Sequence, residues 1–578
     1  MQLAACATVP IVSTADKLDR LYEEYFEAQL QLSPTSATYL GDERYNDQLE
    51  NPASAAFDSE NTAIEKRFLQ RARSVGDQAV TSAQQVSYDI FVSDRERTLQ
   101  SLQYPSRYLA INQLDSMAAT FAQLGSGSGP QPFRDARDYQ RFLKRGEGFV
   151  RWVDSAISSL REGVRHGVTQ PRVVMAKVVP QLREIGVVNP ENSIFWQPLR
   201  DMPVTIPAAE RSRLTVEYRK AFGERILPAY RRLADFIQNE YLPQARTTVG
   251  WSALPNGVEW YRDRIRSQTT TTLSAEEIHQ LGLREVARIR AAMENVRQTT
   301  GFSGDLKAFF VYLQTDPRFY YNSAAELLAG YQDLKKRIDG LLPAEFADFP
   351  RSDYEIREVE PFRAASAAGG SYQQPSADGK RPGIFYVNTF NLKAQPKFGM
   401  ETLSLHEAAP GHHFQIAIQQ ELTDLPRFRR FGGYVAYAEG WALYCESIGK
   451  ELGLFTDPYQ WYGRLSDEML RAMRLVVDTG LHAKGWTREQ AIAYMQANSS
   501  MADSDVEAEV ERYIVWPGQA LGYKVGQLRI TALRARAEAA LGKRFDIKAF
   551  HSQVLRDGAV PLDVLEAKID RWVAAQKP

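Results

Sequence analysis

The spacing of apolar side chains predicts helices along most of the first 350 residues. In the first helix, apolar positions recur every three or four residues and define one face, and Ser33-Pro34 then ends it. A later helix begins at a capping box, in which Ser274 stands three residues before Glu277. The helices predicted in this way cover residues 13–31, 60–125, 134–165, 207–243 and 274–298, with a loop at 125–130 and a proline-rich stretch at 180–207.

The pattern changes to that of short strands after residue 350. Residues 354–359 alternate apolar and polar side chains, and residues 384–389 form a second β-like run after a Gly- and Ser-rich loop. Beyond residue 400 the helical spacing returns. These patterns predict a mainly α fold with a small β element. The regions that we expect are a tail at 1–12, a helical region at 13–350 and a second region at 351–578 that forms one continuous unit with it.

Composition excludes several classes of protein. The formal net charge is −1 and the sequence pI is about 6.7, so no nucleic-acid partner is expected. A hydrophobic content of 44% with 24% charged residues is typical of a globular protein. No apolar run is long enough for a transmembrane helix. With only two cysteines, Cys6 and Cys445, a disulfide framework is excluded.

The N-terminal cysteine lies in a sequence that resembles the lipobox of bacterial lipoproteins. Leu3-Ala4-Ala5-Cys6 has the residue types of that box, but the basic and apolar segments of a signal peptide do not precede it. We therefore expect a precursor that begins upstream of Met1, a lipid anchor on Cys6, and a location in the periplasm or outer envelope. The alternative is an accidental match in a cytoplasmic protein with a frayed N-terminus.

A cluster of histidines carries the strongest chemical signal. Three of the seven histidines lie between residues 406 and 413, and Glu407 follows the first of them directly. Two imidazoles and an adjacent glutamate are typical of zinc peptidase helices, in which the glutamate activates the metal-bound water. In the usual His-Glu-x-x-His motif the second histidine comes four residues after the first. Here Pro410 occupies that position.

Helix geometry indicates which later histidine binds the metal. His413 would lie roughly 10 Å along a regular helix from His406, too far for two ligands that each reach about 2.1 Å to one zinc ion. His412 becomes equivalent to the usual second ligand if two residues bulge out of the helix. Pro410-Gly411 can produce such a bulge, because proline lacks the N–H and glycine permits unusual backbone angles. We therefore assign His406 and His412 as ligands and Glu407 as the base.

A catalytic zinc site needs a third protein ligand, for which Glu439 is the strongest candidate. Glu439 lies in an apolar and aromatic stretch, where an unpaired carboxylate would be costly. The alternative is an ion pair with Arg429 or Arg430. Glu446, seven residues later, is the second choice as a ligand.

Two later segments offer groups that could stabilise the oxyanion formed during hydrolysis. Asp478 and His482 share a helix face, so the aspartate could orient the imidazole for hydrogen bonding or proton transfer, or the two could form a structural pair. Arg512 and Tyr513 supply a cation and a phenol as candidates for substrate binding. Tyr523 is the preferred oxyanion donor, although aromatic residues at helical spacing more often belong to a core.

The chain resembles the bacterial domain-of-unknown-function family 885 (DUF885), whose members carry His-Glu-x-x-Pro-Gly-His. The resemblance implies a large helical body like that of gluzincin oligopeptidases and carboxypeptidases. It also implies His406, His412 and Glu439 as metal ligands and Glu407 as catalytic base. Many relatives are described as lipoproteins, in agreement with Cys6. The residues that carry the resemblance are His406-Glu407, Pro410-Gly411-His412, Glu439-Gly440-Trp441, Asp478–His482, Pro517–Ala520, Tyr523–Gln527 and the stretch from Ser33-Pro34 to Gly41.

These observations predict a metallopeptidase that uses one zinc ion and hydrolyses short peptides. We expect Asn388 and its strand to hold the substrate backbone, because zinc peptidases often place an edge strand beside the metal. One alternative is a zinc amidase or deacylase that acts on modified amino acids. A second is a binding lipoprotein without catalytic activity, although such a protein would not need Glu407 beside the metal.

Overall fold

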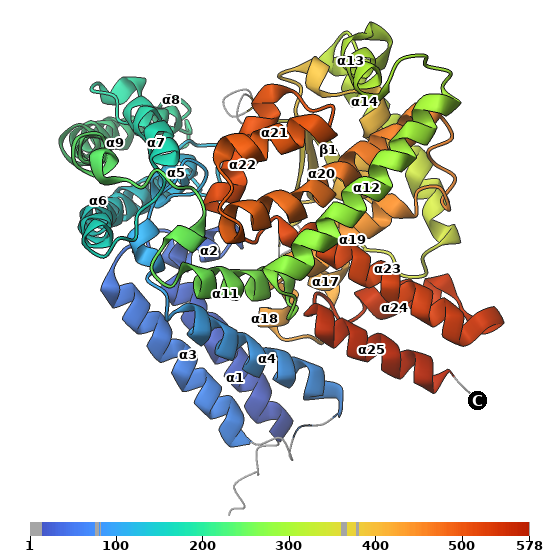
Figure 1. The fold of residues 1–578 in the computed structure, drawn as a ribbon. Coiled ribbons are helices and arrows are strands. Elements are labelled where there is room, and N and C mark those ends of the chain that lie inside the picture. Colours follow the sequence, from blue (N-terminus) through green and yellow to red (C-terminus); the bar gives the residue numbers. More distant parts are fainter. Residues whose placement is uncertain are drawn as a thin grey trace, which may run out of the picture.

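The computed structural model describes residues 14–75, 80, 82–359, 364, 367–376 and 381–576. Helices make up most of these residues, and their strands form one three-stranded sheet (Figure 1). The mainly α fold predicted from the sequence is therefore confirmed. The tail predicted at 1–12, with Cys6, lies outside the described residues.

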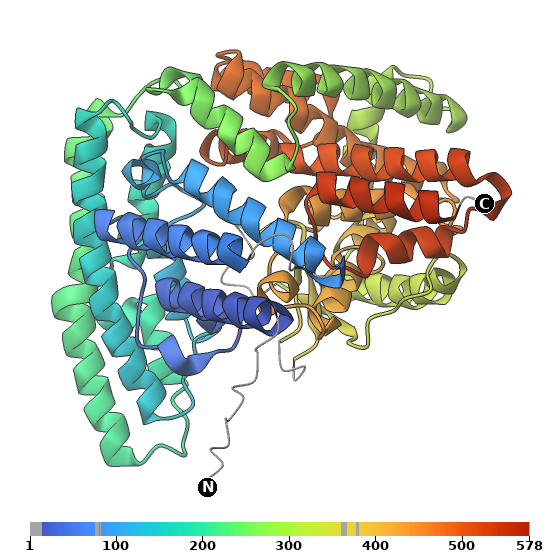
Figure 2. The same ribbon diagram turned by 90° about the horizontal axis from the view of Figure 1, so that it is seen from below.

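The N-terminal helices lie side by side along one flank of the molecule (Figure 2). The first of them closely matches the helix predicted at 13–31, and apolar residues such as Leu18 and Tyr22 bury the expected face. Among the described residues, the region predicted as helical over 60–125 contains three separate α-helices and a short 3-10 helix, Ser106–Leu109. The bounds are α1 Thr14–Leu32, α2 Pro34–Tyr39, α3 Ala55–Val75, α4 Ser82–Ser101 and α5 Met117–Leu124.

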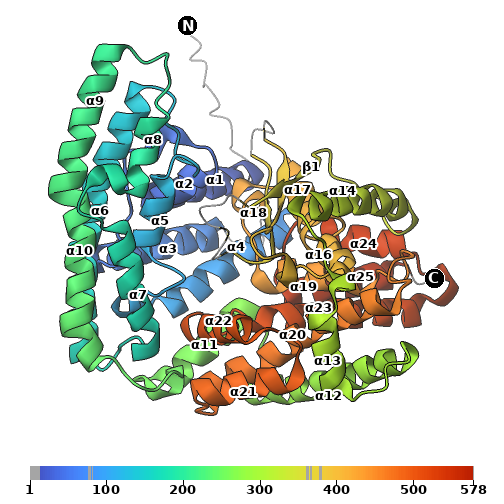
Figure 3. The same ribbon diagram turned by 90° about the horizontal axis from the view of Figure 1, so that it is seen from above.

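Long helices at one end of the molecule lie opposite the C-terminal helices (Figure 3). The helix predicted at 207–243 is continuous through two π-helical turns, Phe222–Ile226 and Ile237–Tyr241. The proline-rich stretch before it contains α7, a helix that we did not predict and that includes Pro180. The bounds are α6 Ala136–Arg165, α7 Arg172–Ile185, α8 Gln197–Arg200, α9 Ala208–Ala221 and α10 Leu227–Phe236.

The next group of helices connects the two ends of the molecule. The capping box at Ser274 is present, since its side chain accepts a hydrogen bond from the Glu277 N–H and Glu277 bonds back to the Ser274 N–H. The helix that follows packs along α20, Pro458–Ala483 (Figure 1). The bounds are α11 Gly257–Thr269, α12 Ala275–Thr299, α13 Leu306–Thr315 and α14 Ala324–Leu341.

The sheet contains one more strand than we predicted. Its order is β1-β3-β2, with β1 parallel and β2 antiparallel to the central strand, and the bounds are β1 Tyr354–Glu358, β2 Gly370–Gln373 and β3 Gly383–Val387. The expectation that the strand before Asn388 would pair with a substrate is wrong, because β3 is already paired on both sides. The edge strand that contacts α16 and α17 is β2, which lies in the predicted loop.

The C-terminal helices surround the centre of the molecule. The largest apolar core includes residues from Ala53 to Ala520, so the packing is continuous across residue 350. No helix among the described residues combines enough length and apolar character to cross a membrane. The bounds are α16 Met400–Glu407, α17 His412–Glu421, α18 Arg427–Arg430, α19 Val435–Ser447, α20 Pro458–Ala483, α21 Arg488–Asn498, α22 Asp503–Val515, α23 Leu521–Leu541, α24 Ile547–Leu555 and α25 Leu562–Ala575.

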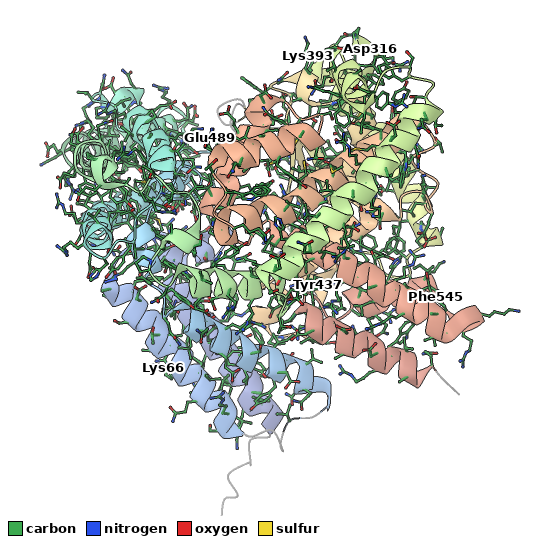
Figure 4. The ribbon with its side chains drawn as sticks, in the orientation of Figure 1. Lys66, Asp316, Lys393, Tyr437, Glu489 and Phe545 are labelled. Carbon is green, nitrogen blue, oxygen red and sulfur yellow. The ribbon has the colours of Figure 1, made fainter. Side chains whose placement is uncertain are left out.

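Helices α19 and α23 cross at a pair of glycines, and this crossing positions the candidate site. A Cβ at Gly440 would lie 2.5 Å from the Gly526 Cα, so neither helix can carry a side chain there without moving apart. Tyr437, on α19, is fully buried in the interior of this half of the molecule (Figure 4). The close crossing brings Glu439, one residue before Gly440, near Tyr523 on α23.

Candidate metal centre

The histidine motif lies where one helix ends and the next begins. Helix α16 ends at Glu407 and α17 begins at His412, so the two-residue bulge that we expected is a complete break. A Cβ at residue 411 would lie 1.9 Å from the His406 carbonyl oxygen, so only glycine permits the chain to turn here. The Pro410 carbonyl in this break accepts a hydrogen bond from the Trp441 indole at 2.8 Å. Helix α19 thus fixes the turn between the two histidines.

Three side chains meet at this break and form a group that could hold a metal ion. They are His406, His412 and Glu439, and one ligand atom of each lies within 4.8 Å of the others. Glu439 Oε2 is 3.4 Å from His406 Nε2 and 3.3 Å from His412 Nε2. The two imidazole planes are nearly perpendicular, at 88°. These are the three ligands predicted from the sequence.

A second carboxylate holds His406 from the opposite side. Glu446 Oε1 lies 2.7 Å from His406 Nδ1, which leaves Nε2 directed at Glu439. Burial opposes protonation of His406, but Glu439 and Glu446 raise its pKa to about 10. Glu446 was our second choice as a ligand. The structure places it where such carboxylates commonly orient a metal-binding histidine.

The geometry and charge of the cluster fit a cation. Burial alone would raise the pKa of Glu439, but His412 and His406 hold it well below its usual range. Its Oε2 is buried and makes no hydrogen bond in the described part of the chain. The ion pair with Arg429 or Arg430 that we considered is absent, because those guanidinium groups bond to Ser87 and to the Asp557 and Gln420 carbonyls. A divalent ion between two imidazoles and a carboxylate would satisfy these groups.

His413 is directed away from the cluster and toward the sheet. Its Nδ1 lies 2.9 Å from the Tyr372 hydroxyl on β2, and its Nε2 lies 3.1 Å from the Ser352 carbonyl. Burial lowers the pKa of His413 to about 4. Both ring nitrogens are therefore occupied by structural partners, and His413 is not part of the candidate centre.

Glu407 and Tyr523 are the two groups beside the cluster that remain available for chemistry. Among the described residues, the Glu407 carboxylate makes no hydrogen bond or ion pair, although its charge acts on neighbouring His406. The Tyr523 hydroxyl accepts a hydrogen bond from Arg512 at 3.1 Å. Burial, and then the charge of Glu439, raise the pKa of Tyr523, which keeps its proton available for donation.

Two of the predicted substrate-binding residues have structural roles instead. The Tyr513 hydroxyl donates to Glu509 at 2.6 Å, and Arg512 bonds to Gln519 as well as to Tyr523. We therefore correct Tyr513 to a member of the network behind the site, and Arg512 to a residue that positions Tyr523.

The prediction for Asn388 is wrong for a similar reason. Its amide donates to the Ala364 and Ala367 carbonyls, and its Oδ1 accepts from the Phe390 N–H. Both N–H groups of the amide are therefore used within the protein, and Oδ1 already accepts one hydrogen bond. Asn388 instead closes the loop that returns beside β3.

The expected pairing of Asp478 with His482 is also absent. His482 is fully buried, its Nδ1 accepts from the Trp251 N–H at 3.1 Å, and its Nε2 donates to the Tyr513 carbonyl at 2.9 Å. Asp478 instead accepts from the Tyr261 hydroxyl and the Gly518 N–H. With both ring nitrogens bonded, His482 cannot donate to an oxyanion, and we correct its role to a structural one.

His482 should therefore affect stability in acid rather than turnover. Burial lowers its pKa from 6.5 to about 3, so the stability that it contributes is complete above pH 6.5 and is lost as the pH falls toward 3. The loss can reach about 1.4 kcal/mol per pH unit in that range. We expect His482→Gln to unfold with a shallower dependence on pH between 6.5 and 4 in urea titrations. An unchanged slope would contradict this assignment.

Charged residues on α20 form a part of the site that sequence reasoning missed. Asp467, Arg471 and Arg474 occur at intervals of four and three residues, and therefore share one face of a largely apolar helix. Arg471 pairs with Asp467, and the Arg474 guanidinium lies 4.4 Å from the Tyr523 ring centre. Their spacing within an apolar helix was the sequence signal available.

Comparison with solved structures supports this description of the fold. A provisionally described lipoprotein from Colwellia psychrerythraea has a TM-score of 0.90 and 30% sequence identity, covering 98% of this chain and 100% of its own. A second provisionally described lipoprotein, of unknown function, from Shewanella oneidensis has a TM-score of 0.73 and 19% identity, covering 96% of this chain and 99% of its own. No curated protein sequence matches the chain. The bacterial protein family of unknown function DUF885 matches residues 34–569, and the chain belongs to this family.

Proposed function

We propose that the protein is a zinc-dependent metallopeptidase that hydrolyses short peptides. The observation that carries this proposal is the convergence of His406, His412 and Glu439 beside Glu407. Two imidazoles and one carboxylate form the ligand set of many catalytic zinc sites, in which the fourth position is left for water or substrate. The adjacent glutamate, which has no structural partner among the described residues, fits the role of a base.

Each residue of the site has a defined part in such a reaction. When bound, a zinc ion would supply Lewis-acid polarisation of the peptide carbonyl and would acidify water. Glu407 accepts the proton of the attacking water and passes it to the leaving amine. Tyr523 donates a hydrogen bond to the carbonyl oxygen as negative charge develops there, and Arg512 positions that hydroxyl. Glu446 keeps His406 in the orientation that directs Nε2 toward Glu439, where the two side chains would hold the ion.

The surroundings of the cluster favour short substrates. His406 is buried, and the side chains of His412 and Glu439 are only 13% and 19% exposed. The reacting bond must therefore enter between helices, which an extended peptide can do more readily than a folded domain. The preference for short peptides follows from this burial.

Metal analysis combined with a peptide library tests the function directly. Purified protein should contain about one equivalent of zinc, as expected for a single site with three protein ligands. Mass spectrometry of products should then show cleavage of short peptides that stops after zinc is removed and resumes after zinc is returned. A parallel set of N-acylated amino acids distinguishes a deacylase. Cleavage of that set alone would contradict the peptidase proposal.

We also propose that the protein is anchored to the bacterial envelope by a lipid on Cys6. The Leu3-Ala4-Ala5-Cys6 sequence supports this proposal, as do the two structurally similar proteins described as lipoproteins. We expect the protein, expressed from its own genomic locus, to incorporate labelled palmitate, and Cys6→Ser to abolish the label. Labelling that persists in Cys6→Ser would show that this cysteine is not the anchor.

A further inference from the structure

A cavity of about 570 Å³ lies between the N-terminal helices and the start of α19. Helices α1 and α4 form one wall, α11 forms a second, and α18 with the first turn of α19 forms a third. Figure 1 shows α4, α11 and α18 in this part of the molecule. The cavity thus separates segments that are far apart in the sequence, and one of them is the helix that carries Glu439.

The walls of this cavity contain several buried polar atoms without hydrogen-bond partners among the described residues. They are Arg95 Nη1, Arg264 Nε, Gln268 Oε1 and Arg429 Nε. Polar groups removed from water are normally paired, because an unpaired buried group costs free energy. Three of these atoms are guanidinium nitrogens, which can donate to a negatively charged ligand, whereas Gln268 Oε1 can accept from a polar one.

Arg264 is the residue best suited to bind that ligand. In the described part of the chain, its guanidinium makes no hydrogen bond or ion pair, and burial lowers its pKa. The two nearest acids are engaged elsewhere, Asp263 with the Ser101 hydroxyl and Asp478 with Tyr261 and Gly518. By contrast, Arg97 on the same cavity is paired with Asp94. The charges of Asp263 and Asp478 still act on Arg264, but its N–H groups have no acceptor among the described residues and can donate into the cavity.

Gln268 adds a neutral side-chain amide to the wall of the cavity that carries Arg264. It stands four residues after Arg264 on α11, so the two side chains share one helix face. Its side-chain amide makes no hydrogen bond with any described residue, and its N–H groups remain free to donate. A guanidinium and an amide side by side match the hydrogen-bonding needs of a carboxylate.

The cavity reaches the first turn of α19, the helix that carries Glu439. Val435 lines the cavity, and Glu439 lies one turn further along the same face of α19. A Cβ on Gly522 would lie 2.9 Å from Val435 Cγ1 and 3.0 Å from the Gln268 carbonyl oxygen, and Tyr523 is the next residue. The helices that build the cavity wall are thus the same ones that place Glu439 and Tyr523.

We propose that this cavity binds the C-terminal carboxylate of the peptide substrate through Arg264 and Gln268. The proposal rests on the peptidase function proposed above and defines its substrate class. One helical turn spans about 5.4 Å. An extended peptide covers about 3.3–3.6 Å per residue, so a short C-terminal segment could span the turn of α19 between Val435 and Glu439. The enzyme would therefore remove short C-terminal fragments and would disfavour internal cleavage.

A binding experiment tests this proposal without hydrolysis. The probes are N-acetyl-Ala-Ala-Ala and its C-terminal carboxamide, measured by calorimetry on the full-length Glu407→Gln protein. We expect the acid to bind roughly tenfold or more tightly than the amide, because a charge-assisted pair with arginine is lost in the amide. Adding Arg264→Met should remove this preference. Adding Arg97→Met, which alters an already paired arginine on the same cavity, should retain it.

Two further variants keep the test decisive if Arg264→Met does not fold. Arg264→Lys retains the charge and should keep part of the preference for the acid, whereas Gln268→Leu should reduce it. Thermal unfolding of each variant separates loss of binding from loss of structure. Equal binding of acid and amide, failure of the acid to bind, or a preference that survives Arg264→Met would overturn the proposal.

Hydrolysis of the same peptides by the wild-type protein separates this inference from the proposed function. If the acid binds in an Arg264-dependent manner but no peptide is cleaved, the carboxylate site stands and the peptidase function fails. If acid and amide peptides bind and are cleaved equally well, the peptidase function stands and the carboxylate site fails.

Discussion

The Glu407→Gln protein should bind zinc as the wild-type protein does but hydrolyse peptides roughly 10²–10⁴-fold more slowly. The substitution keeps the size and hydrogen-bonding shape of the side chain and removes the group that accepts a proton from water. Glu407 makes no hydrogen bond or ion pair with other described residues, so its replacement should leave the fold unchanged. The measurements are kcat on a cleaved library peptide, zinc content, and thermal stability.

Glu451→Gln is a suitable control, since it also neutralises a glutamate but lies in a surface ion pair with Arg534. It should retain wild-type activity. A Glu407→Gln protein that turns over at the wild-type rate would show that another group activates the water. Loss of zinc together with activity would instead assign Glu407 to metal binding.

The Glu439→Ala protein should lose zinc almost completely. Glu439 Oε2 is the atom that lies near both imidazoles, and alanine leaves only two protein ligands. Its affinity for zinc should fall further than the zinc affinity of the Glu446→Gln protein. That substitution removes only the partner that orients His406, a change that typically costs about 10–100-fold. Titration with a competing chelator measures all of these affinities on one scale.

His413→Ala provides the matched control for the metal ligands. It removes a histidine adjacent to His412 whose ring nitrogens bond to Tyr372 and Ser352. It should lower stability yet keep zinc, whereas His412→Ala should lose it. Zinc retained by Glu439→Ala but lost from His413→Ala would refute the ligand set.

Much of the fold follows from local patterns in the sequence. The first helix, the capping box at Ser274 and the two strands around residues 354 and 384 lie within a few residues of their predicted positions. The third strand was missed because Gly370–Gln373 is short and lies in a Gly- and Ser-rich stretch. Its residues do not favour an extended strand by themselves, and hydrogen bonding to β3 stabilises it.

The sequence by itself determined the helical class and the three side chains that converge beside Glu407. The class follows from the period of apolar residues, and the two histidines follow from a proline and a glycine that prevent a regular helix between His406 and His412. Glu439 was predicted from its apolar and aromatic neighbours, in which an unpaired carboxylate would be costly. Only the tertiary structure decided which polar groups are already bonded. The His482 imidazole accepts a hydrogen bond from the Trp251 N–H, 231 residues away in the sequence. Glu446 hydrogen-bonds to His406 from 40 residues away. Whether a polar side chain is free for chemistry depends on which distant elements pack against it, and local sequence does not encode those contacts.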